Sequence, residues 1–113
     1  ERRFMRYCDL NQDILYWASE ELPVRYYNPL DKKYHRYFPD FVVKTVNNEK
    51  YMIEIKPSRQ VAKPKPPKKK TKSYMRESFE YIKNQAKWQA AKSYCDDKGM
   101  KFKLITEKDL GQY

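Results

Sequence analysis

The chain of 113 residues has few of the residues that build disulfide-rich or zinc-binding domains, because it contains only two cysteines and one histidine. Cys8 and Cys95 are too few and too far apart for a disulfide framework or a zinc site. We expect both to be buried thiols in a reducing compartment. No signal peptide is visible, and because the sequence opens at Glu1 without a methionine we expect an N-terminally truncated chain.

Long apolar runs are also missing from the sequence. No stretch approaches the roughly 18 apolar residues that a membrane-spanning helix needs, and no amphipathic anchor accompanies the lysines, so we expect no membrane partner. Hydrophobic residues make up 40% of the chain and aromatic residues 16%, which is enough for a modest core. The sequence therefore predicts a single domain over residues 1–113.

The net charge of +10 is concentrated in residues 57–72, which we call the basic segment. This segment contains no acid and carries seven cations, namely Arg59, Lys63, Lys65, Lys68, Lys69, Lys70 and Lys72. Such a cluster predicts binding to the phosphate backbone of nucleic acid, because phosphate contacts release counterions and give affinity that is independent of sequence. Prolines are interleaved with the cations, so we expect a stiff, extended and solvated loop.

Hydrophobic spacing predicts an α/β (α+β) domain with the order helix, three antiparallel strands, long helix and strand. The three antiparallel strands are expected over residues 22–27, 33–46 and 51–56. Residues 1–8 have the spacing of the end of a first helix. Residues 11–21 fit a helix and a strand equally well, so we expect an irregular segment there.

The long helix is expected between Ser73, which is a fair N-cap, and Gly99, which suits the residue that closes a helix. Residues 100–104 then alternate as a final strand that returns to the sheet after a crossover, and residues 107–110 add one helical turn. The helix carries an apolar stripe that is predicted to face the core, made of Met75, Phe79, Ile82, Ala86, Trp88, Ala91 and Cys95.

Two short motifs point to chemistry. Pro39-Asp40 lies in the second predicted strand and Glu54-Ile55-Lys56 in the third, where alternation puts Glu54 and Lys56 on one face. If the hairpin register brings Asp40 alongside, the three side chains form an acidic pocket with one basic member, able to hold Mg²⁺ and to position a water molecule. The alternative is an exposed ion pair on an edge strand, because such triplets also occur by chance in lysine-rich chains.

With an aspartate on the second strand and Glu-x-Lys on the third, this element order resembles the PD-(D/E)XK nuclease superfamily over essentially the whole chain. Finer matches resemble the head completion nucleases of large contractile-tailed bacteriophages. They lie in residues 4–9, 17–21, 35–41, 53–57, 84–91 and 102–110. The endonuclease subunits of heteromeric transposases share a similar plan.

The resemblance implies a metal-dependent DNA endonuclease that uses Mg²⁺, for which Mn²⁺ can substitute. It implies that Asp40 and Glu54 bind the metal, with the backbone carbonyl of Ile55 as a third candidate ligand. Lys56 would orient or deprotonate the attacking water, or stabilise charge on the phosphoryl oxygens, and we favour the electrostatic role. In both families a glutamate near the end of the first helix belongs to the active site, and Glu1 matches that position.

The resemblance further implies trimming of packaged DNA during head completion and head–tail joining. DNA is then the main partner, with phage portal or neck proteins as further partners, in the cytoplasm of the infected bacterial host or on the virion. Two alternatives stay open, namely a transposase-type subunit that cuts DNA ends and a non-catalytic DNA-binding module on the same fold. The second would predict loss of Asp40, Glu54 or Lys56, and all three are present.

Other polar residues have less specific interpretations. Glu20 and Glu21 are reserve acidic candidates that are more typical of solvated charges. His35 falls on the strand face opposite the aspartate of the motif, which favours a role on the surface or in support of the site over metal ligation. For Gln85 and Lys87 a position at the site, at the DNA backbone or on a solvated helix face stays open. Core packing is favoured over base stacking for Tyr26, Tyr27, Tyr34 and Tyr37.

Overall fold

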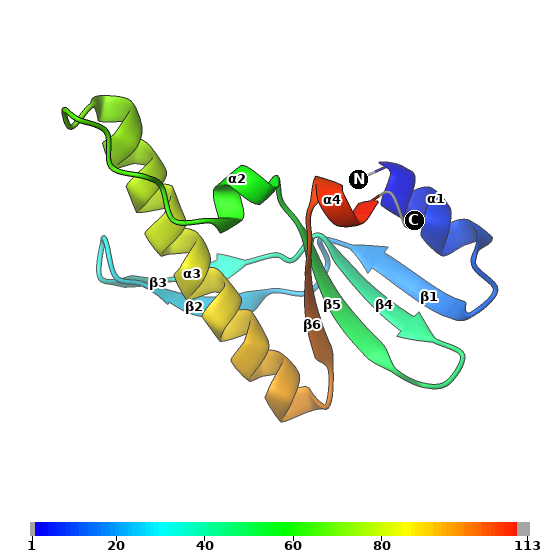
Figure 1. The fold of residues 1–113 in the computed structure, drawn as a ribbon. Coiled ribbons are helices and arrows are strands. Elements are labelled where there is room, and N and C mark those ends of the chain that lie inside the picture. The colour runs from blue at the N-terminus through cyan, green and yellow to red at the C-terminus, as the bar shows by residue number, and fades with distance from the viewer. Residues whose placement is uncertain (1, 111–113) are drawn as a thin grey trace.

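The predicted α+β order is confirmed in the computed structural model, which describes residues 2–110 (Figure 1). The elements are α1 (Arg2–Leu10), β1 (Ile14–Ser19), β2 (Val24–Asn28), β3 (Lys33–Tyr37), β4 (Phe41–Thr45), β5 (Lys50–Ile55), α2 (Ser58–Val61), α3 (Lys72–Lys98), β6 (Lys101–Ile105) and α4 (Glu107–Leu110). Of the helices in this part of the chain, none has the length and apolar character needed to cross a membrane.

The central sheet has four strands in the order β1-β4-β5-β6. β4 pairs antiparallel with both β1 and β5, whereas β6 runs parallel to β5. A parallel neighbour needs a crossover connection, and α3 supplies it. The last strand therefore returns to the sheet in the way that the sequence predicts.

The segment expected to be irregular contains strand β1, so that expectation was wrong for residues 14–19. Pairing with β4 decides between helix and strand, because Trp17 lies opposite Val43 and Ala18 opposite Val42. The Trp17 indole also packs edge-on against Phe41 at 5.8 Å and donates a hydrogen bond to Asp9 Oδ1 at 2.8 Å. These are tertiary contacts, which override a balanced local preference.

The single strand expected over residues 33–46 is also wrong, because the structure divides it into β3 and β4. β3 pairs with β2 in a separate two-stranded sheet, which we call the β2–β3 ribbon, while β4 joins the central sheet. The chain breaks at Pro39, which has no backbone donor to continue a ladder and is fully buried. Asp40 consequently lies at the junction of the two sheets, immediately before β4.

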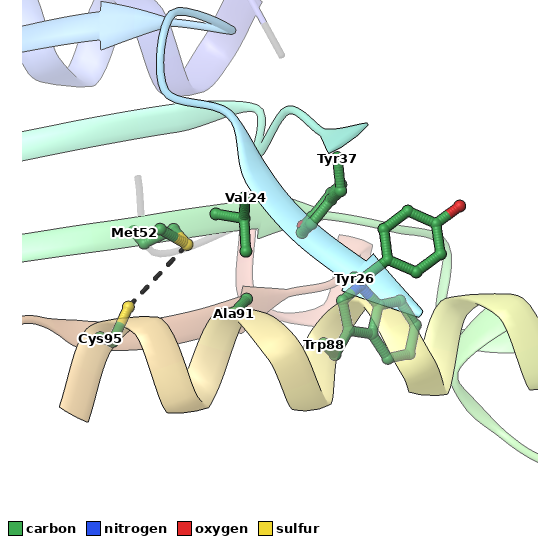
Figure 2. Close-up of a cluster of buried hydrophobic side chains, with 7 residues drawn as sticks. All are labelled: Val24, Tyr26, Tyr37, Met52, Trp88, Ala91 and Cys95. Atoms are coloured by element: carbon green, nitrogen blue, oxygen red, sulfur yellow. Dashed lines mark hydrogen bonds between the residues drawn. The ribbon is translucent and has the colours of Figure 1, made fainter. Parts of the chain in front are cut away.

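The core has two clusters of buried side chains. One contains Phe4 and Cys8 of α1 together with Phe41, Val43, Ile53 and Ile105 of the central sheet. The other lies beneath α3 and joins the ribbon to β5, and Figure 2 shows Val24, Tyr26, Tyr37, Met52, Trp88, Ala91 and Cys95 packed together. Both cysteines are free and buried as predicted, and burial raises the pKa of each thiol to about 11.

Helix α3 differs from expectation at its N-terminal half. Thr71, rather than Ser73, is the N-cap, and its hydroxyl accepts a hydrogen bond from the Tyr74 amide at 3.1 Å. Gly99 closes the helix with a φ of 67°, as predicted. The C-terminal half of the apolar stripe is buried, but Met75, Phe79 and Ile82 are 48%, 48% and 39% exposed. The N-terminal end of α3 extends past the central sheet (Figure 1).

Candidate functional site

Asp40 and Glu54 meet at the junction between the ribbon and the central sheet. Asp40 precedes β4, and Glu54 is the penultimate residue of the neighbouring strand β5. The Asp40 Oδ2 atom accepts a hydrogen bond from the backbone N–H of Ile55 at 2.8 Å, which holds this carboxylate beside Glu54. The structure therefore brings the two sequence motifs together.

The Glu54 carboxylate is buried, with only 4% of the residue exposed. Its Oε2 atom accepts a hydrogen bond from the Tyr37 hydroxyl at 2.6 Å, and its Oε1 atom lies 3.6 Å from Lys56 Nζ. Burial raises the pKa of Glu54, and the charge of Asp40 raises this pKa further, against the opposing effects of Tyr37 and Lys56. An exposed edge-strand pair is therefore excluded, because β5 is an interior strand and Glu54 is almost fully buried.

Two lysines from different elements lie near this carboxylate. Lys56 follows β5, and its backbone N–H donates to the Ile105 carbonyl at 2.9 Å. Lys87 of α3 is partly buried, with its Nζ atom 5.6 Å from the centre of the Tyr37 ring. Burial lowers the pKa of Lys87, and the positive charges of nearby lysines, Lys56 among them, lower it further. Lys87 thus faces the site.

The sequence left open whether Gln85 and Lys87 of α3 lie at the site or on a solvated helix face. The structure separates them, because Gln85 is exposed and Lys87 is partly buried. The spacing of Lys87 from buried residues of the same helix indicates its orientation. Lys87 stands three residues after the buried Asn84 and four before the buried Ala91, positions that share one side of a helix.

Tyr37 is a functional candidate that sequence reasoning assigned only to the core. It is buried as expected, but its hydroxyl also anchors Glu54. Burial, reinforced by the Glu54 charge and hydrogen bond, raises the pKa of Tyr37 far above its ordinary value, so the phenol remains a neutral donor. Its place at the end of β3, three residues before Asp40, is the sequence feature that could have identified it.

The hydrogen bond from Tyr37 gives a prediction about stability. Tyr37→Phe should lower the free energy of unfolding by about 1–3 kcal/mol at neutral pH, because the buried Glu54 carboxylate loses a donor. Urea denaturation measures the effect. Tyr34→Phe is the matched control, since the Tyr34 side chain is 60% exposed, and it should change stability little. Equal losses in the two variants would contradict the anchoring role of Tyr37.

The reserve acidic residues do not join the two carboxylates. The Glu20 backbone N–H donates to the Asp40 carbonyl at 3.2 Å, but its side chain is exposed, and Glu21 accepts from the Tyr16 hydroxyl at 3.5 Å. Within residues 2–110 no three His, Cys, Asp or Glu side chains gather as a metal site. Glu1, the candidate on the first helix, lies outside the described residues.

His35 occupies the surface, as predicted. Its Nε2 atom lies 2.6 Å from Asp31 Oδ2, and both side chains are about 40% exposed.

The four tyrosines of the ribbon differ in burial. Tyr26 and Tyr37 are buried as expected, whereas Tyr27 and Tyr34 are exposed, so core packing was the wrong expectation for the second pair.

All seven cations of the basic segment are exposed, but the segment is only partly extended. Residues 58–61 form the short helix α2, and Lys72 already belongs to α3, so the expectation of a continuous extended loop was wrong at both ends. Contacts with α4 hold the α2 end, because Glu107 accepts hydrogen bonds from the Ser58 hydroxyl and, at 2.8 Å, from the Ser58 backbone N–H.

The mixed sheet, the paired carboxylates and the neighbouring lysine have the arrangement that the sequence resemblance to nucleases implies, and comparison with known proteins identifies the family. A profile of the family described as TnsA-like endonuclease N terminal matches residues 11–107, and the chain belongs to this family. The head completion nuclease of Enterobacteria phage T4 is 33% identical over an alignment 114 residues long, which covers 97% of this chain and 76% of that protein. No solved structure matches the chain at a significant level. The resemblance to these nucleases is therefore confirmed.

Proposed function

We propose that the chain is a Mg²⁺-dependent DNA endonuclease whose reaction centre consists of Asp40, Glu54 and Lys56. The observation that carries the proposal is the buried Glu54 carboxylate, set beside Asp40 and 3.6 Å from the Lys56 ammonium. A nuclease needs negative charge to hold a cation and positive charge to meet the phosphoryl oxygens, and these three residues supply both within one small site.

The two carboxylates fit a divalent cation. Mg²⁺ is commonly held by one or two carboxylates, with water and substrate phosphates completing its shell, so a third acidic ligand is not required. The charge of Asp40 already raises the pKa of Glu54, and this repulsion is what a bound cation would relieve. Asp40 and Glu54 are the proposed ligands, with the Ile55 carbonyl as a further candidate.

The remaining side chains would prepare the site for phosphodiester hydrolysis. When bound, the metal would supply Lewis acidity and a more acidic water. Tyr37 fixes the Glu54 carboxylate through its 2.6 Å hydrogen bond. Lys56, 30% exposed in its side chain, is placed to stabilise the charge that develops on the phosphoryl oxygens. Lys87 adds a second positive charge on the α3 side.

Metal dependence can be tested directly on supercoiled plasmid. Nicking should require Mg²⁺ or Mn²⁺, stop on addition of EDTA and return when excess metal is restored, because the proposed reaction needs a cation that Asp40 and Glu54 would hold. Gel electrophoresis of the nicked and linear products provides the measurement. Cleavage that continues unchanged in EDTA would overturn the metal-dependent proposal, and no cleavage in any divalent metal would favour a non-catalytic DNA-binding module.

We propose that the biological role is trimming of packaged DNA before head–tail joining, in the cytoplasm of an infected bacterium. The support is the 33% identity to the head completion nuclease of phage T4. A T4 lysate that lacks its own head completion nuclease offers a test, since the added chain should restore joining of heads to tails. An active nuclease that fails this test and cuts transposon ends would favour the transposase-type alternative.

We also propose that the basic segment binds DNA phosphates and contributes affinity rather than chemistry. Lys68→Gln/Lys69→Gln/Lys70→Gln should flatten the slope of log affinity against log salt by up to about 3 units, while cleavage at saturating DNA persists. Fluorescence anisotropy in Ca²⁺ measures binding without cutting. The control removes three other exposed lysines, Lys92, Lys98 and Lys101.

The competing role for the basic segment is docking on portal or neck proteins. In that case the triple variant would bind DNA with an unchanged salt slope and would fail only in head–tail joining. Such a result would contradict the assignment of these lysines to DNA.

A further inference from the structure

The β2–β3 ribbon has an outer face that neither core cluster uses. Its antiparallel register pairs Arg25 with Arg36 and Tyr27 with Tyr34. Directly opposed residues, and residues two apart on one strand, point to the same side of a sheet. All four side chains are exposed, whereas the alternate residues of β2 are buried. The outer face therefore presents two guanidinium groups and two phenol rings.

The rings hold one of the arginines in place. The Arg25 guanidinium carbon lies 4.1 Å from the centre of the Tyr34 ring, and the Tyr27 ring packs against the same ring at 5.1 Å with an interplanar angle of 68°. Stacking orients the planar guanidinium and leaves its in-plane N–H groups available to donate. An arginine fixed in this way loses less side-chain entropy when it binds an anion.

The charges on this face oppose folding. Like charges placed directly opposite each other on neighbouring strands are destabilising. In the described part of the chain no carboxylate forms an ion pair with Arg25 or Arg36, since the ion pairs found there involve His35, Lys56 and Lys83. A bound polyanion would relieve the repulsion that the fold leaves in place.

The outer face is also close to the proposed reaction centre. Arg36 precedes Asp40 by four residues, which span at most about 14 Å even when fully extended. Duplex DNA rises about 3.4 Å per base pair, so this distance corresponds to about four base pairs. The intervening Tyr37 contacts Glu54 from the other face of the ribbon. A duplex cut at the carboxylates would extend within reach of the ribbon.

We propose that the outer face of the β2–β3 ribbon is a second DNA contact, in which Arg25 and Arg36 bind phosphates a few base pairs from the cut and Tyr34 positions Arg25. The inference rests on the proposed function, because it takes duplex DNA as the ligand. It adds a contact that is separate in sequence from the basic segment, and it predicts a positioning role that is independent of base sequence.

The test compares two double variants with equal loss of charge. Arg25→Gln/Arg36→Gln alters the ribbon, and Lys98→Gln/Lys101→Gln alters exposed lysines where α3 meets β6, at the end of β6 away from α4 (Figure 1). In Ca²⁺, anisotropy on two unrelated duplexes should show at least about tenfold weaker binding for the ribbon variant and a salt slope flatter by about 2 units. The lysine variant should retain the wild-type slope. Tyr34→Ala, with no change of charge, should weaken binding by several fold.

The thermal melt checks that the ribbon variant is folded, and its melting temperature should stay the same or rise because the like-charge repulsion is gone. If the double variant did not fold, the single variants Arg25→Gln and Arg36→Gln would each be expected to flatten the slope by about 1 unit. Equal losses in the ribbon and lysine variants would overturn the inference, because only net charge would then matter.

The outcome for the wild type separates this inference from the proposed function. Wild-type protein that binds and nicks DNA, together with a ribbon variant that binds equally well, would overturn the ribbon contact alone and indicate a protein-docking surface instead. Wild-type protein with no affinity for DNA would overturn the ribbon contact and the proposed function together.

Discussion

Asp40→Asn and Glu54→Gln should each lower the rate of plasmid nicking in Mg²⁺ by at least about 10²- to 10³-fold, the scale of losing one preorganised electrostatic contact. Each change removes a charge from the proposed metal site and keeps the shape of the side chain. The amide that replaces either carboxylate would retain an oxygen acceptor for the Ile55 N–H or the Tyr37 hydroxyl, which now bond the carboxylates at 2.8 Å and 2.6 Å. Single-turnover cleavage measures the rate.

Both variants should remain folded, which separates catalysis from stability. Glu54→Gln should melt at or above the wild-type temperature, because it removes a buried charge that is costly to desolvate. Glu49→Gln is the matched control, because Glu49 is an exposed carboxylate that directly precedes β5, at the end of the strand away from Glu54. This variant should cut normally. Full activity in both site variants would remove the carboxylates from the reaction.

Lys56→Gln should lower the single-turnover rate by about a hundredfold, because it removes the ammonium proposed to stabilise phosphoryl charge. Metal affinity should change little, since the proposed ligands are carboxylates and Lys56 Nζ lies 3.6 Å from Glu54 Oε1. Rapid-quench cleavage gives the rate, and calorimetry with Mn²⁺ gives the affinity.

Lys50→Gln is the matched control for Lys56→Gln, because Lys50 is exposed at the start of the same strand. It should cut at the wild-type rate. If metal binding were lost together with the rate in Lys56→Gln, the lysine would shape the metal site, and its electrostatic role in the reaction would be unsupported.

The paired motifs could be predicted from the sequence because each is local. A proline next to an aspartate, followed by Glu-x-Lys in the next strand, indicates that two carboxylates and an ammonium group can lie close together. The charge of the basic segment can be read from the composition alone. Whether residues 33–46 form one strand or two is different. Pro39 permits a break, but the break becomes definite only when β3 pairs with β2 and β4 pairs with β1 and β5.

Residues that depend on three-dimensional neighbours escaped prediction for the same reason. The Tyr37 hydroxyl reaches Glu54 across 17 positions of sequence, and Lys87 approaches from a helix that follows a crossover. Phe79 fits an apolar helix stripe, yet it is 48% exposed, because the spacing of apolar residues does not show which part of the helix has a partner. The opposed pair Arg25 and Arg36 becomes visible only with the register of the ribbon.

A crystal structure with bound Mn²⁺ would show whether Asp40 and Glu54 together hold a divalent cation. We expect an anomalous peak about 2 Å from carboxylate oxygens of both residues, a typical distance for a small divalent cation. Protein from the same preparation should nick plasmid in Mn²⁺. A Mn²⁺ ion bound away from both carboxylates, in protein that cleaves DNA under those conditions, would show that Asp40 and Glu54 are not the metal ligands.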